Sequence, residues 1–390
     1  MRQVYLDYSA TTPVKKEVLD AMLPYFTEKF GNPSSLYTIG QESKEAVTKA
    51  RGQVAAYINA DPSEVYFTAG GSEGDNWALL GTMDSLRAKG KNHVITTKIE
   101  HHAILHTCEF MEQHGYDVTY LGIDCNGRID LNELEAAITD KTGLISVMFV
   151  NNEIGTLQPI EEIGKIAKKH GVLFHTDAVQ ALGNFQIDVK AMNIDMLSVS
   201  GHKIYGPKGV GALYIRKGLR ISNYIHGGAQ EMKRRAGTEN LASIVGFGKA
   251  AEISQANFDW HVKHCSELRD YLIEEILNKI PNTYVNGTMD GRLPGNANIT
   301  FEFIEGEAML LYLDMKGIAV STGSACSSAS LVPSHVLTAL GIPVERIHGT
   351  LRLTVGDFTT KDDIDYTVEA LIEIVDKLRK ISSVSAEKGW

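Results

Sequence analysis

Cysteine, proline and long apolar runs are all scarce in this sequence, and each shortage excludes a class of protein. Four cysteines in 390 residues, without a CxxC or Cys/His spacing, exclude a disulfide framework and a zinc-finger cage and favour a reducing compartment. The ten prolines are spread thinly, and no run approaches the ~18 apolar residues that a membrane span needs. Because the first residues carry no apolar leader segment either, we expect a cytoplasmic protein.

Positive charge is also in deficit, since 38 Lys and Arg residues face 48 Asp and Glu residues and give a net charge of −10. This balance disfavours a protein that neutralises nucleic-acid phosphates, so neither nucleic acid nor a membrane is an expected partner. The remaining composition, 43% hydrophobic and 22% charged, is that of a globular protein. The length suits two domains, because single cores stop growing near ~250 to 300 residues.

Short apolar runs alternate with amphipathic segments, which predicts an α/β fold. Runs that are apolar on both faces are typical of a mainly parallel sheet with helices on both sides. A helical pattern over 241–280, interrupted near Asn257, leads into a second unit. That unit has new strands near 298–303 and 319–321 and a closing helix capped at Thr360. The strands expected in the first unit are Glu64–Thr68, His93–Thr97, Val118–Leu121, Leu144–Val150, Val172–Thr176, Met196–Ser200 and Gly211–Ile215.

Polar clusters follow several of these strands, at the edge where ligands of such sheets bind. A glycine-rich turn at 69–74 opens a helix, where free backbone N–H groups bind phosphate. Its spacing is neither GxGxxG nor a Walker loop, so a phosphate site and a plain tight turn are equally supported. Asp177, at the end of another strand, either caps a helix or keeps a ring nitrogen protonated.

Two nucleophilic side chains lie among small residues. Lys203, close to Ser200 and His202, is either a surface lysine or an amine that forms a Schiff base with a phosphorylated aldehyde. Cys326 has serine, glycine and alanine neighbours with little bulk to bury it, which favours an accessible thiol. The other cysteines are expected to be buried small hydrophobic residues: Cys108, Cys125 and Cys265.

Histidine and arginine residues complete the set of candidates. His102 and His106 have the i, i+4 spacing of a helical metal pair, but no third ligand is evident, so no resident metal is expected. His101, nearest the preceding strand, can stack on a planar ring or move protons. Arg352, on an expected strand, suits a substrate carboxylate and a structural carboxylate equally well.

Eight motifs, taken in order, resemble those of the cysteine desulfurases of the NifS/IscS type, in the class V aminotransferase family. The resemblance covers nearly the full length of the chain. The motifs are Leu-Asp-Tyr-Ser-Ala-Thr-Thr-Pro (6–13), Gly-Asn-Pro-Ser-Ser (31–35), Glu-His (100–101), Val-Asn-Asn-Glu-Ile-Gly (150–155), His-Thr-Asp-Ala-Val-Gln (175–180), Ser-Gly-His-Lys (200–203), Ala-Gly-Thr (236–238) and Gly-Ser-Ala-Cys (323–326).

This resemblance implies a fold-type I enzyme dependent on pyridoxal 5'-phosphate. The implied fold has a mainly parallel seven-stranded sheet with helices on both sides, plus a smaller α+β C-terminal domain. Residues 13–255 would form the large cofactor-binding domain, and residues 1–12 with 256–390 the small domain that carries the cysteine loop.

Site residues are implied by the same resemblance. Lys203 would bind the cofactor aldehyde, Asp177 would pair with its ring nitrogen, and His101 would stack over the ring and assist proton transfer. Arg352 would hold the substrate carboxylate, which Asn152 would help to place. The other residues expected at the cofactor are Gly71, Ser72, Gln180, Ser200, His202 and, across the interface of a homodimer, Thr238.

The activity implied is the removal of sulfur from L-cysteine, which gives L-alanine and a persulfide on Cys326. Sulfur would then pass to an acceptor such as an iron–sulfur scaffold protein, and Cys326 could transiently ligate a cluster. Which acceptor and pathway are served, nitrogenase maturation or general cluster assembly, stays open, as do activity on selenocysteine and the role of the C-terminal tail.

Two other functions compete with this one. A selenocysteine lyase, a cysteine sulfinate desulfinase or a class V aminotransferase would keep the cofactor but change the substrate. A non-catalytic sulfur carrier would only present Cys326 to a partner. The sequence departs from the usual family pattern at Tyr37, Gly71-Ser72, Ala236 and Asp357, where histidine, Ala-Thr, serine and arginine are frequent, but none of these changes removes a catalytic group.

Overall fold

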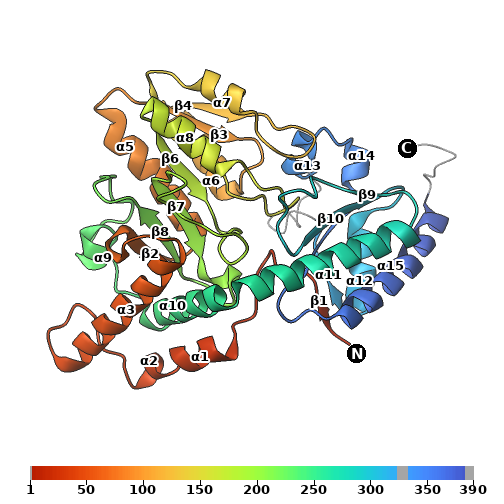
Figure 1. Ribbon diagram of the computed structural model, residues 1–390, viewed down its shortest axis with the longest axis horizontal. Coiled ribbons are helices and arrows are strands. Elements are labelled where there is room, and N and C mark those ends of the chain that lie inside the picture. Colours follow the sequence, from red (N-terminus) through yellow and green to blue (C-terminus); the bar gives the residue numbers. More distant parts are fainter. Residues whose placement is uncertain (1, 323–332, 383–390) are drawn as a thin grey trace.

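A seven-stranded sheet forms the centre of the molecule in the computed structural model, which describes residues 2–322 and 333–382 (Figure 1). The strand order is β2-β8-β7-β6-β5-β3-β4, and β8 alone runs against the others. The predicted mainly parallel seven-stranded sheet is therefore confirmed. The strands are β2 (Val65–Thr68), β3 (His93–Thr97), β4 (Asp117–Leu121), β5 (Thr142–Ser146), β6 (Leu173–Asp177), β7 (Met196–Ser200) and β8 (Gly211–Ile215).

Helices cover both faces of this sheet, because each presents an apolar stripe to it. In α8 (Ile160–His170), Ile160, Ile163 and Ala167 are buried at spacings of three and four residues. The same core contains side chains of α1 (Lys16–Met22), α3 (Thr38–Tyr57), α7 (Leu131–Ala137) and α10 (Leu241–Ala256). A second core contains side chains of the π-helix η2 (Trp77–Gly81), which continues α4 (Gly71–Asn76), and of α5 (Thr82–Arg87) and α6 (His102–Gln113).

The C-terminal part of the chain has its own core and a three-stranded antiparallel sheet of order β12-β10-β9. Val4 and Leu6 belong to this core, because β1 (Val4–Tyr5) pairs with β11 (Ile318–Ala319). The boundary at residues 12 and 255 stays a prediction. The other elements of this core are β9 (Thr283–Val285), β10 (Asn296–Phe301), β12 (Thr350–Thr354), α11 (Phe258–Lys279), α12 (Gly306–Met315) and α15 (Lys361–Ile381).

Local signals in the sequence set two helix boundaries. The long helical pattern breaks at Asn257, between α10 and α11, and α11 crosses from the large sheet to the C-terminal core (Figure 1). α15 begins with the predicted cap: Thr360 Oγ1 accepts from the Asp363 N–H at 3.2 Å, and Asp363 Oδ2 accepts from the Thr360 N–H at 3.0 Å.

One buried cysteine was predicted wrongly. Cys108 and Cys265 are buried as expected, but Cys125 is exposed. It lies in a surface turn in which Asp124 Oδ1 accepts hydrogen bonds from the N–H groups of Asn126 and Arg128, both at 2.9 Å. Local Asp capping, which favours surface turns, therefore outweighs the general tendency of cysteine to be buried.

The remaining elements are short. They are α2 (Pro24–Thr27), η1 (Pro62–Glu64), η3 (Gly201–Lys203), α9 (Gln230–Lys233), α13 (His335–Ala339) and α14 (Val344–Ile347). Within residues 2–322 and 333–382, none of the helices combines the length and the apolar character that crossing a membrane requires.

Candidate active site

The carboxyl ends of the parallel strands meet at one edge of the large sheet and border a cavity of about 1100 Å³, which includes solvent at its mouth. Chain segments that follow β2, β3, β5, β6 and β7 all reach it. The predicted site residues that line the cavity are Gly71, Ser72, His101, Asn152, Asp177, Gln180, Ser200, His202, Lys203 and Arg352. The fold thus gathers predicted site residues that lie up to 281 residues apart in sequence (Gly71 and Arg352).

Lys203 is held by the N-terminal segment. It ends the single turn η3, directly after β7, and its Nζ donates to Ser9 O and, at 2.9 Å, to Ala10 O. Gln180 Nε2 donates to the same Ser9 carbonyl at 2.8 Å. Two backbone carbonyls therefore orient the amine that the sequence predicts to be the nucleophile.

Asp177 supplies a carboxylate to the cavity. It is the last residue of β6, is 7% exposed, and its Oδ1 accepts from the Val179 N–H at 2.9 Å. Burial raises the pKa of Asp177, whereas the positive charges of His101 and Lys203 act in the opposite direction. A cationic ring nitrogen placed beside it would favour the ionised form further.

Two further carboxyl groups, Asp75 and Glu100, line the cavity close to Asp177 and are each only 1% exposed. Burial raises the pKa of Glu100 to about 8 and that of Asp75 well above its ordinary value, and the charge of Asp177 adds to both shifts. Asp75 Oδ1 and Glu100 Oε2 have no hydrogen-bond partner in the part of the chain that the structure describes. Burial and the neighbouring charge of Asp177 therefore both favour the protonated forms of Asp75 and Glu100.

A neutral histidine, His175, lies next to one of these acids, Asp75. His175 is fully buried, and its ring nitrogens lie 2.9 Å from Ser146 Oγ and 3.0 Å from Ser198 Oγ. Its Nε2 is 3.7 Å from Asp75 Oδ1. Burial lowers the pKa of His175 to about 3, so the imidazole stays uncharged.

A cradle suited to an anion lies at the start of α4. Gly71 and Ser72 begin this helix after β2, and Ser200 and His202 lie opposite them at the end of β7. Gly71 leaves no room for a larger residue, since an added Cβ would lie 2.5 Å from Val179 Cγ2. Burial, together with the charges of Lys203 and Lys208, lowers the pKa of His202 to about 4.

Arg352 combines both roles that the sequence left open. It lies on β12, is 1% exposed, and its Nη2 donates to Asp7 Oδ1 at 2.9 Å. Its Nη1 donates to the Asn152 carbonyl at 3.1 Å. The same guanidinium borders the cavity, so a structural ion pair holds it where a substrate carboxylate can reach it.

One of the predicted site residues that the structure describes does not line this cavity. Thr238 is exposed on the loop before α10. Cys326 lies outside the described residues. Sequence reasoning gave no role to Ser9, Asp75, Glu100 and His335, which do line the cavity. Two of these residues could have been found from the sequence: Glu100 follows β3, and Asp75 lies one helical turn beyond Gly71. His335, in contrast, reaches the site only through the tertiary fold.

The residues present fit pyridoxal phosphate. Lys203 offers an amine for the aldehyde, buried Asp177 offers a carboxylate for the ring nitrogen, and the start of α4 offers N–H and hydroxyl groups for the phosphate. Val179 and Met148, which also line the cavity, would offer apolar surface for its ring.

Comparisons with known proteins agree with this site. A family model described as aminotransferase class-V matches residues 4–367. A protein of Methanosarcina thermophila named cysteine desulfurase IscS is 57% identical over 387 residues, which cover 99% of this chain and 95% of the relative. A protein of the same name from Dictyoglomus turgidum is 51% identical over 386 residues, which cover 99% and 98%.

Solved structures give the same result. One titled NIFS-like protein superposes with a TM-score of 0.91 at 36% identity, over 97% of this chain and 100% of that chain. Another, titled SspA in complex with cysteine, has a TM-score of 0.81 at 39% identity, over 92% and 100%. The predicted fold and resemblance are confirmed, and the chain belongs to the aminotransferase class-V family.

Proposed function

We propose that the chain is a pyridoxal-phosphate-dependent cysteine desulfurase, which takes sulfur from L-cysteine and releases L-alanine. The observation that carries this proposal is the meeting of an amine, a buried carboxylate and a guanidinium around one cavity: Lys203, Asp177 and Arg352. Relatives that bear the name cysteine desulfurase match nearly the whole chain.

When bound, pyridoxal phosphate withdraws electrons from the substrate and makes its α-proton acidic. Asp177 keeps the ring nitrogen charged, and Arg352 orients the substrate through its carboxylate. The Ser9 and Ala10 carbonyls hold the Lys203 amine, which moves the proton at the α-carbon. His101, the residue before α6, is placed at the cavity to assist that transfer.

Sulfur transfer is the role proposed for Cys326. Its thiolate attacks the sulfur of the substrate, a new S–S bond forms, and the C–S bond of the substrate breaks. The carbon skeleton keeps the electron pair of that bond, takes up a proton and leaves as L-alanine. Cys326 retains the sulfur as a persulfide, which an acceptor protein then collects.

A homodimer is the proposed active unit, with Thr238 of the partner subunit completing the phosphate site. The exposed position of Thr238 supports this arrangement. So do apolar side chains between α1 and α3 that have no cover in the described chain: Phe26 is 60%, Phe30 65% and Leu36 93% exposed.

A complementation experiment tests the shared site. Mixing a Lys203→Ala chain with a Thr238→Asp chain should restore activity that neither parent has, because the hybrid dimer contains one intact site. No restoration from proven hybrids would contradict a shared site.

We further propose that the protein works in the cytoplasm and delivers sulfur to a scaffold protein for iron–sulfur cluster assembly. The low cysteine content supports a reducing compartment.

The main test follows sulfur on the protein. Purified protein should be yellow, and after incubation with L-cysteine the peptide that contains Cys326 should gain the mass of one sulfur atom. Lys203→Ala should abolish both the yellow colour and the added sulfur mass. Cys326→Ser should abolish only the added sulfur mass. Cys125→Ser is the matched control, because Cys125 is exposed and does not line the cavity. Normal sulfur delivery by Cys326→Ser, or a colourless wild-type protein, would contradict the proposal.

A further inference from the structure

Behind Lys203 and Gln180, away from the cofactor cavity, lies a second pocket at the junction of the large sheet and the C-terminal core. Ser9, Gln180 and Lys203 border both pockets. One wall of the second pocket carries a compact charged cluster of Lys15, His261 and Asp357, which lies outside the cofactor site.

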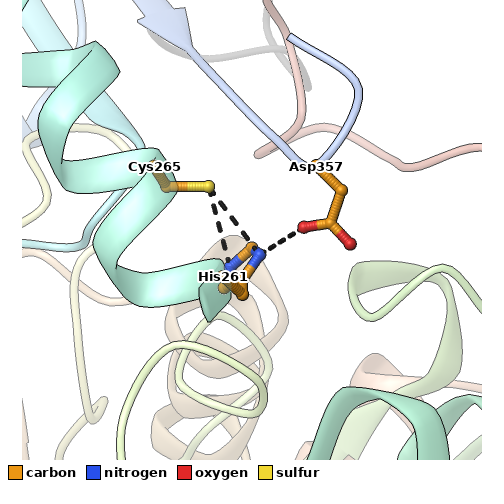
Figure 2. A group of neighbouring side chains, drawn as sticks. All are labelled: His261, Cys265 and Asp357. Atoms are coloured by element: carbon orange, nitrogen blue, oxygen red, sulfur yellow. Dashed lines mark hydrogen bonds and ion pairs between the residues drawn. The ribbon is translucent and has the colours of Figure 1, made fainter. Parts of the chain in front are cut away.

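Asp357, just after β12, is the centre of this cluster. Its Oδ1 contacts His261 Nδ1 (Figure 2), and its Oδ2 lies 2.5 Å from Lys15 Nζ. Burial alone would raise the pKa of Asp357, but the hydrogen bonds and charges of His261 and Lys15 lower it below its ordinary value. The carboxylate is therefore ionised and has a donor on each oxygen.

The contacts also define the protons on His261. Asn184 Nδ2 donates to the Gln180 carbonyl at 3.0 Å, which turns Asn184 Oδ1 toward His261 Nε2 at 3.1 Å. Both ring nitrogens then face oxygen acceptors, a geometry that favours a hydrogen on each of them, as in an imidazolium. Two cations thus share one carboxylate.

Two chains of contacts connect this cluster to residues of the cofactor site. The Asp357 N–H donates to Tyr205 Oη at 2.7 Å, and Lys15 Nζ lies 4.6 Å from the centre of the Tyr205 ring. Tyr205 is two residues beyond Lys203 and has a φ of 64°, a left-handed conformation that needs support from its surroundings. The other chain of contacts runs from His261 through Asn184 to the backbone of Gln180.

We propose that His261 and Asp357 are positioning residues, which act from the C-terminal part of the chain to fix Lys203 and Gln180 at the cofactor. This inference depends on the role of Lys203 proposed above. The coupling works in two ways: hydrogen bonds fix the backbone around Lys203, and the charges of the cluster act on the Lys203 nitrogen across the second pocket.

A metal ion is the alternative occupant of this cluster. Ligand atoms of His261, Cys265 and Asp357 lie within 4.8 Å of one another (Figure 2). However, the Lys15 ammonium already neutralises the carboxylate, and burial raises the pKa of the Cys265 thiol, so that the thiol stays protonated. A divalent cation would add positive charge to a cluster that already holds two cations.

The charges of His261 and Asp357 predict that replacing each residue shifts, in opposite directions, the pH at which the Lys203 nitrogen loses its proton. In His261→Gln a positive charge is lost, so the Lys203 nitrogen bound to the cofactor should keep its proton to higher pH. In Asp357→Asn a negative charge is lost, so the same proton should leave at lower pH. The other titratable groups around His261 are unchanged in both variants: Lys15, Tyr8, Tyr205 and Cys265.

The experiment titrates the cofactor absorbance of the holoenzyme with pH. We expect the midpoint to rise by about half a pH unit in His261→Gln and to fall by a similar amount in Asp357→Asn. Both variants should also release the cofactor faster than wild type. His170→Gln is the matched control, because His170 Nε2 also pairs with a carboxylate, Glu135 Oε1 at 2.7 Å, but on the surface of α8.

Shifts of the same sign in His261→Gln and Asp357→Asn, or no shift in either, would overturn the proposal. If Asp357→Asn does not fold, Lys15→Met replaces it: loss of this cation should raise the midpoint as in His261→Gln, and a fall or an unchanged midpoint would overturn the proposal. Tightly bound zinc in purified holoenzyme, lost in Cys265→Ser, would overturn the proposal in favour of a metal site. Failure of the proposed function looks different, since Lys203→Ala would then leave the absorbance band in place.

Discussion

Arg352 Nη2 lies 2.9 Å from Asp7 Oδ1, so a buried guanidinium of β12 is neutralised by a carboxylate of the N-terminal segment. Its Nε has no hydrogen-bond partner among the residues that the structure describes. The ion pair fixes the plane of the guanidinium and leaves donor capacity beside the cavity, which is what recognition of a second carboxylate needs.

Replacing Arg352 with Lys should keep the charge but lose the forked geometry. Because one charge-assisted hydrogen bond is worth ~1.5–3 kcal/mol, we expect the KM for L-cysteine to rise by about 10- to 100-fold, with a smaller change in kcat. Steady-state kinetics measure the two separately. Arg128→Lys, which alters an exposed pair with Asp290, is the control. An unchanged KM would remove Arg352 from substrate binding.

Glu100 should make the protein less stable as pH rises. Its pKa is about 8 in the fold, mainly through burial, against an ordinary value of 4.5, so the folded state holds a proton that the unfolded state loses. Its cost to stability is absent below pH 4.5 and grows up to pH 8. Glu100→Gln should therefore gain ~2–3 kcal/mol relative to wild type between pH 5 and pH 7. Thermal midpoints of both proteins across this range test the difference, and parallel curves would contradict it.

His175 should make the protein less stable as pH falls. Burial lowers its pKa from 6.5 to about 3, so the unfolded state takes up a proton that the fold excludes. The stability that depends on the neutral ring is complete above pH 6.5 and is lost as pH falls toward 3. His175→Gln should be less stable at pH 7, because hydrogen bonds to Ser146 and Ser198 weaken, but should lose less stability on acidification. His114→Gln, at an exposed histidine, should show the wild-type slope.

The effects of substitutions at Gly71 and Val179 on cofactor retention should depend on each other. A methyl group at position 71 would lie 2.5 Å from Val179 Cγ2, so Gly71→Ala should displace the start of α4 and weaken retention of the cofactor by about 10-fold, the effect of ~1–2 kcal/mol of overpacking. Gly71→Ala combined with Val179→Ala should restore retention. Gly52→Ala, in open space on α3, should leave retention unchanged. A double variant as weak as Gly71→Ala would disprove the steric coupling.

Much of the fold and of the site follows from local sequence signals. The strand that ends at Asp177, the helix break at Asn257 and the cap at Thr360 each depend on neighbouring residues, and all three appear as expected. The cavity could be located because the carboxyl ends of parallel strands share one edge of a sheet.

Other features depend on contacts between distant residues. Asp7 and Arg352 are 345 residues apart, and no periodicity links them. The protons on Asp75 and Glu100 depend on burial beside Asp177, which a single sequence does not reveal. The imidazolium of His261 depends on how Asn184 is turned, a property of packing and not of residue type.

The pairing of β1 with β11, and of Asp7 with Arg352, has a consequence for biosynthesis. Ser9 and Ala10 are synthesised long before β11, the strand that anchors their segment and lies about 300 residues downstream. During translation the Lys203 amine therefore emerges without its final supports. The cofactor site therefore reaches its working geometry only after synthesis has passed β12.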